Sequence, residues 1–93
     1  MPEKIRREYC FHGLVQGVGF RYHAKYQAAA LGLTGWVRNE YDGTVTMQVQ
    51  GDRASIDQLI TELQSDRYID IDDFTVKTVP VEEGEYRFTV KHG

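Results

Sequence analysis

Residues 13–21 place Gly13, Gly17 and Gly19 between a strand-like run and a helix-like run, and Arg21 closes the stretch. Glycine lets the backbone turn sharply and lets successive N–H groups converge without interference from a Cβ atom. The N-terminus of the following helix adds unpaired N–H donors and a partial positive charge. The stretch therefore predicts a strand–loop–helix unit that binds a phosphate group, with Arg21 as a planar, permanently charged partner for two phosphate oxygens.

Two familiar phosphate-binding loops do not fit this spacing. A P-loop requires a lysine followed by serine or threonine, whereas Phe20 and Arg21 follow the last glycine. A dinucleotide-binding loop requires a third small residue at the position that Tyr22 occupies. Cys10 lies upstream on the expected strand, too far from Arg21 for a thiol phosphatase in which both groups share one tight loop.

Hydrophobic periodicity predicts the elements on either side of the loop. Apolar and polar residues alternate over 6–13, which indicates a strand. Apolar residues recur at helical spacing over 20–31, and Gly32 is expected to end that helix. Residues 34–38 and 44–50 have the pattern of two strands joined by a turn with an Asp-Gly step, so they are expected to pair as a hairpin.

The second half of the chain predicts a helix and further strands. Asp52 is a candidate N-cap, and the residues behind it form a helical apolar stripe. Apolar residues then change from odd to even positions near Asp72 and Asp73, so a bend or bulge is expected there. A turn over 82–84 precedes a final strand. The stripe comprises Ile56, Leu59, Ile60 and Leu63, and the final strand carries Tyr86, Phe88 and Val90.

The element order is βαββαβ, with an additional irregular or strand-like piece before the fourth strand. This order predicts an α+β, ferredoxin-like sandwich in which one antiparallel sheet carries both helices on one face. With 93 residues, the chain is expected to form one domain over 1–93. The architecture hosts enzymes, RNA binders and regulatory modules, so it does not decide the function.

Two stretches of the chain resemble the signatures of the acylphosphatase family. Residues 13–21 resemble the first signature, and residues 35–39, followed by Gly43, Val45 and Gly51, resemble the second. The resemblance implies the ferredoxin-like fold and hydrolysis of the carboxyl-phosphate bond of acyl phosphates to a carboxylate and inorganic phosphate. It implies no metal and no cofactor.

The resemblance also implies a role for each residue of the site. Arg21 corresponds to the phosphate-binding catalytic arginine, and Asn39 to the asparagine that positions the attacking water. A carboxylate leaves without being protonated, so the site needs no strong general acid. The substrate is expected to be a small-molecule acyl phosphate, with inorganic phosphate or sulfate as competing anions. The backbone N–H groups expected to hold the phosphate belong to Val15, Gln16, Gly17, Val18, Gly19 and Phe20.

Several residues admit a second interpretation. The side chain of Gln16 either contributes a hydrogen bond to the site or stabilises the loop. Thr44 either braces Asn39 or pairs across the hairpin, and the second interpretation is favoured. Trp36 is expected to pack in the core rather than to stack on a substrate. The part that residues 66–73 play at the rim of the site is left open.

Charge and composition narrow the classes of partner. The formal net charge of −3 argues against nonspecific nucleic-acid binding, and the basic group Lys4, Arg6 and Arg7 is expected to be a solvated strand end. The single cysteine excludes an internal disulfide, and no apolar run reaches the length of a membrane span. We therefore expect a cytoplasmic monomer without membrane or nucleic-acid partners. Two rival functions remain open: an anion-binding module without turnover, and RNA binding on the aromatic face of the sheet.

Overall fold

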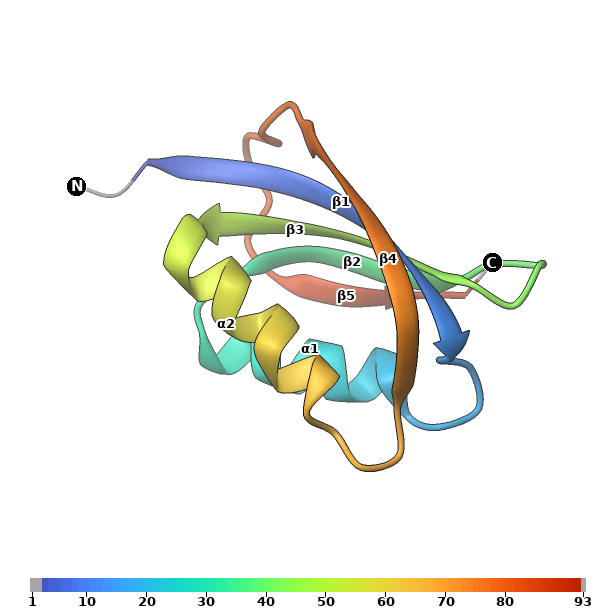
Figure 1. The fold of residues 1–93 in the computed structure, drawn as a ribbon. Helices are drawn as coiled ribbons and strands as arrows, with labels where there is room; N and C mark the ends of the chain where they lie inside the picture. The colour runs from blue at the N-terminus through green and yellow to red at the C-terminus, as the bar shows by residue number, and fades with distance from the viewer. Residues whose placement is uncertain (1–2, 93) are drawn as a thin grey trace.

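The computed structural model describes residues 3–92, which form one five-stranded sheet and two helices. The strand order in the sheet is β4-β1-β3-β2-β5, and both helices cover one face of it (Figure 1). The predicted α+β, ferredoxin-like arrangement is confirmed. The elements are β1 (Lys4–Leu14), α1 (Phe20–Ala30), β2 (Thr34–Asn39), β3 (Val45–Asp52), α2 (Arg53–Gln64), β4 (Asp70–Val79) and β5 (Phe88–Lys91).

The core lies between the sheet and the two helices. Tyr9 and Phe11 alternate with polar residues along β1, and both face the helices and are buried. The rings of Phe11 and Phe20 lie 5.0 Å apart, which ties the end of β1 to the first residue of α1. Burial of one such ring contributes about 1.5–3 kcal/mol. The strand and the helix that flank the glycine loop are therefore fixed against each other through the core.

Helix α2 begins and packs as its sequence predicts. The Asp52 carboxylate accepts a hydrogen bond from the Ser55 backbone N–H at 3.1 Å, so it caps the helix. The four residues of the predicted apolar stripe are all buried. The helix therefore covers the middle of the sheet with one face and exposes the other.

The expected bulge lies in β4. His12 pairs with Asp73 and Gly13 pairs with Ile71, so Asp72 is the extra residue in the pairing of β1 with β4. Gly13 has a φ of +126°, and a Cβ atom there would lie 2.2 Å from the Asp70 carbonyl oxygen. The close approach of the two backbones requires glycine at this position, which is where β1 gives way to the loop.

Strand β5 differs from the prediction. It pairs in parallel with β2, with Phe88 opposite Gly35, so the sheet is mixed rather than wholly antiparallel. The expected bend does not divide β4, which is one continuous strand at one edge of the sheet. The final strand, β5, lies at the opposite edge. Because residues 80–87 connect one edge of the sheet to the other, β5 enters in the same direction as β2. Tyr86, which was predicted in this strand, lies before it and is 88% exposed.

The sheet face that the helices leave uncovered holds a polar network, and it corrects two expectations. Arg6 is buried: its guanidinium donates to both carboxylate oxygens of Glu85, at 2.8 and 3.2 Å, and to Gln48 at 2.7 Å. It is therefore no solvated strand end. Trp36 is half-buried on this face, with the Lys91 ammonium 4.3 Å from its ring, so it is not a core residue.

Neither helix within residues 3–92 is both long and apolar enough to cross a bilayer.

Candidate active site

The glycine loop follows β1 and delivers the chain into α1. Gly17 and Gly19 have φ values of +75° and +81°, in the left-handed region that favours glycine. Gly19 is the N-cap of α1 and offers no side-chain acceptor to the first turn. The N–H groups of that turn are therefore not capped by a side chain, which is the condition under which a helix N-terminus binds an anion.

A cavity of about 200 Å³ lies where this loop meets the end of β2. It brings Arg21 and Asn39 together although 18 positions separate them in the sequence. Of the six predicted phosphate-binding residues, four line the cavity, whereas Gln16 and Val18 do not. The lining residues are Val15, Gly17, Gly19, Phe20, Arg21, Tyr22 and Asn39.

Gln16 ties the loop to the β2–β3 turn. Its side-chain amide donates to the backbone oxygens of Glu40 and Thr44, at 2.8 and 2.9 Å. Of the two interpretations of this side chain, loop stabilisation is the one that the contacts support. Because Glu40 follows Asn39 directly, the same two hydrogen bonds hold the end of β2 at a fixed distance from the loop.

Thr44 pairs across the hairpin, which is the favoured interpretation: its backbone oxygen accepts a hydrogen bond from the Glu40 N–H at 2.8 Å. Its hydroxyl donates to the Asp42 carboxylate at 2.7 Å, and its backbone N–H donates to the same oxygen at 3.0 Å. These bonds lower the pKa of Asp42, the hydroxyl bond most. Together they close the β2–β3 turn, so Thr44 acts on Asn39 only through the shape of that turn.

Asn39 is the last residue of β2 and presents an unpaired acceptor. Its side-chain oxygen is buried and has no hydrogen-bond partner among residues 3–92. A buried polar atom without a partner costs about 1–3 kcal/mol, so such atoms occur where a ligand or water completes them. Asn39 is part of the cavity wall, together with loop residues and Arg21.

Arg21 projects from the first turn of α1 and is half-buried. Its guanidinium donates to the His92 imidazole at 3.4 Å, and it forms no ion pair with any acid among the described residues. No acid lines the cavity. Most of the donor fork of Arg21 is therefore available to an anion.

Sequence reasoning did not find Tyr22 and His92. Tyr22 follows Arg21 on α1 and lines the cavity, so its position next to Arg21 in the sequence could have identified it as a site residue. His92 follows β5, 71 positions from Arg21, and no local pattern connects the two residues.

The acidic segment 66–73 reaches α1 rather than the cavity. The Asp66 carboxylate lies 2.5 Å from the His23 imidazole, two residues beyond Arg21 on the same helix. Asp66 also accepts a hydrogen bond from the Tyr68 N–H at 2.8 Å. That backbone bond is the largest cause of its lowered pKa, and His23 adds to the effect. Asp66 thus fastens the α2–β4 connection to the helix that carries Arg21.

Within residues 3–92, no three histidine, cysteine or acidic side chains are grouped so that they could hold a metal ion.

Comparison with known proteins gives a consistent result. Residues 7–90 match the family described as acylphosphatase. An acylphosphatase of Clostridium perfringens is 44% identical, over 91% of this chain and 97% of its own length. The crystal structure of the Bacillus subtilis acylphosphatase superposes with a TM-score of 0.86 and 28% identity, over 94% of this chain and 98% of that one. Full-length HypF, in a phosphate- and nucleotide-bound form, contains a similar region: TM-score 0.87 and 29% identity, over 98% of this chain but only 12% of HypF.

Proposed function

The chain belongs to the acylphosphatase family, and from that premise we propose that its loop cavity hydrolyses the carboxyl-phosphate bond of acyl phosphates without a metal ion. One observation carries the proposal: Arg21, which has no acidic partner among the described residues, and Asn39, whose buried side-chain oxygen has no partner there, line one small cavity. A cavity of about 200 Å³ suits a phosphoryl group, since pockets for larger ligands typically exceed about 300 Å³.

The phosphate end of the substrate is proposed to bind the loop and Arg21. Backbone N–H groups of residues 15–20 point to its oxygens, and the guanidinium of Arg21 holds two of them. These groups neutralise charge on the phosphoryl oxygens while the bond to the acyl group lengthens. Because no acid lines the cavity, no negative charge opposes the bound phosphate.

Asn39 is proposed to orient the attacking water. Its side-chain oxygen accepts a hydrogen bond from that water and aims the water's lone pair at phosphorus. A new bond forms between the water oxygen and phosphorus, and the bond from phosphorus to the acyl oxygen breaks. The acyl group departs as a carboxylate, and the proton of the water passes to a phosphate oxygen of the substrate.

The proposal is tested by release of carboxylate and phosphate from benzoyl phosphate in the presence of EDTA. Wild type is compared with Arg21→Ala and Asn39→Ala, after circular dichroism shows that each variant is folded. Turnover that survives the chelator and is lost in both variants supports the proposal. If the wild type binds phosphate and releases none from the substrate, the chain is an anion-binding module and the proposal is wrong.

We also propose the setting in which this activity operates. The chain acts as a single-domain cytoplasmic monomer on a small-molecule acyl phosphate, with no nucleic acid or membrane as partner. Inorganic phosphate and sulfate should then inhibit competitively, because the loop and Arg21 recognise the tetrahedral anion. Light scattering of the purified protein tests the oligomeric state, and inhibition kinetics with each anion test the competition.

A further inference from the structure

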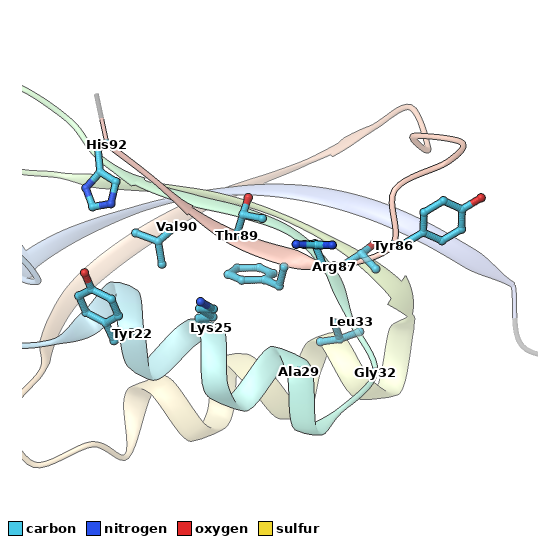
Figure 2. Close-up of a pocket in the computed structure, with 12 residues that line it drawn as sticks. Tyr22, Lys25, Ala29, Gly32, Leu33, Tyr86, Arg87, Thr89, Val90 and His92 are labelled. Atoms are coloured by element: carbon cyan, nitrogen blue, oxygen red, sulfur yellow. The ribbon is translucent and has the colours of Figure 1, made fainter.

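A second, larger hollow lies beside the loop cavity, between α1 and β5. Figure 2 shows it as a groove with Tyr22 and Lys25 on the helix wall and Val90 and His92 on the strand wall. Its volume is about 690 Å³, which is within the usual range of about 300–1,000 Å³ for small-molecule sites. The proposed phosphate chemistry does not use this groove.

The groove and the loop cavity are adjacent. Tyr22 lines both hollows. His92 lines the groove and accepts a hydrogen bond from Arg21, which lines the cavity. A molecule with its phosphate at Arg21 can therefore extend into the groove between α1 and β5.

The groove is basic in a chain of net negative charge. Lys25 and Arg87 line it, and no acid does. Three other hollows on the described surface each contain at least one acidic residue. Lys25 has no ion-pair partner among residues 3–92, so its ammonium is available to a ligand.

Lys25 stands at a defined distance from Arg21. The two residues are four positions apart on α1, and such residues share a helix face with their backbones about 6 Å apart along the axis. A substrate that binds Arg21 through its phosphate therefore meets a second cation about one helical turn into the groove. The apolar side chain of Val90 lies on the opposite wall, across from Tyr22 and Lys25 (Figure 2).

We infer that this groove binds the acyl half of the substrate, and that Lys25 selects acyl phosphates whose acyl chain ends in a second carboxylate. This inference rests on the proposed function and adds a class of substrate to it. The methylene groups of the chain lie along the apolar wall, and the distal carboxylate pairs with Lys25. An acyl group without that carboxylate leaves Lys25 unused.

The test compares two substrates of equal chain length, glutaryl phosphate and valeryl phosphate, which differ by the distal carboxylate. We expect kcat/KM for glutaryl phosphate to exceed that for valeryl phosphate about fivefold, the upper range for one partly exposed charge pair. The ratio should fall close to one in Lys25→Gln and persist in Lys25→Arg, which keeps the charge. It should also shrink at high ionic strength, because salt screens exposed charges. Spontaneous hydrolysis of each substrate is subtracted.

Arg53→Gln is the matched control, since it removes one exposed positive charge from the start of α2, away from the groove. It should keep the wild-type ratio. A wild-type ratio near one, or a high ratio that Lys25→Gln leaves unchanged, overturns the inference while the proposed function stands. If neither substrate is hydrolysed, the proposed function fails as well, so the two failures are distinguishable.

Discussion

Arg6 and Arg21 carry the same guanidinium on opposite sides of the sheet and use it differently. The side chain of Arg6 is 1% exposed, and its donors are occupied by Glu85, Gln48 and Gln50. Arg21 is half-buried beside the glycine loop, and among residues 3–92 its one hydrogen-bond partner is His92, at 3.4 Å. The hydrogen-bonding groups of the polar network on the uncovered sheet face are bonded to one another, whereas groups that line the loop cavity still lack partners within the described part of the chain.

This difference separates stability from binding. A guanidinium that uses four of its five N–H donors on protein acceptors, as Arg6 does, holds segments of the fold together, because removing it leaves buried acceptors and a carboxylate unpaired. A guanidinium with vacant donors contributes little to folding and is ready for an anion. The structure therefore predicts opposite profiles for variants at the two arginines.

The largest expected effect is on catalysis at Arg21. Arg21→Ala should lower kcat for an acyl phosphate on the order of a hundredfold to a thousandfold, since it removes a charge that stabilises the transition state. Its melting temperature should stay close to that of the wild type. Steady-state kinetics and a thermal melt measure both quantities. A variant that melts early and keeps its activity would reverse our comparison.

Arg6→Ala should show the opposite profile. Removing one partner of a buried pair costs about 3–5 kcal/mol, and since Glu85 is 21% exposed we expect the lower end of that range. Urea unfolding measures the loss. Arg7→Ala is the matched control on the same strand, because the partner of Arg7, Asp57, is 61% exposed. That variant should lose less than about 1 kcal/mol. Equal losses of unfolding free energy in both variants would show that the buried ion pair stabilises the fold no more than the exposed one.

A smaller effect is expected at Gln16, which holds the loop to the β2–β3 turn. Gln16→Ala removes two hydrogen bonds, each worth about 0.5–1.5 kcal/mol, and frees the loop from the strand that ends in Asn39. We expect kcat to fall about tenfold, because a displaced catalytic group costs rate more than binding. Steady-state kinetics separate kcat from KM. A change in KM alone would show that Gln16 serves binding rather than the position of Asn39.

The smallest expected effect concerns pH. Burial acts to raise the pKa of Glu85, but the hydrogen bonds of Arg6 and Thr34 and the charges of Arg6 and Lys91 together outweigh it, and the pKa lies below its ordinary value of 4.5. The stability from this pair is therefore fully present above about pH 5.5 and is lost as pH falls below 4.5 toward the folded-state pKa. Urea unfolding at several pH values should show a shallower acid loss in Glu85→Gln than in wild type. Identical slopes would exclude the pair as a source of acid sensitivity.

The sequence predicted the features that depend on neighbouring residues. The helix start after Gly19, the Asp52 cap and the bulge at Asp72 follow from glycine position, capping chemistry and side-chain alternation. Their physical causes lie within a few residues of one another. The grouping of Arg21 with Asn39 was expected through a family resemblance, and the cavity places the two residues together.

The features that sequence reasoning missed depend on long-range pairing. The burial of Arg6 follows from Glu85, 79 positions away. The parallel direction of β5 follows from the path of residues 80–87 between the two sheet edges, which no alternation pattern encodes. Trp36 was expected in the core because of its size, yet cations from β2 and β5 flank its ring on the uncovered face.

The parallel placement of β5 has a practical consequence for handling this protein. It brings His92 within hydrogen-bonding distance of Arg21, whereas the start of β1 lies a whole strand of 11 residues, about 33 Å, from the end that leads into the loop. An affinity tag or fusion partner joined close behind His92 would begin near Arg21. Tags for purification, labels for surface immobilisation and fused reporters therefore belong at the other end of the chain.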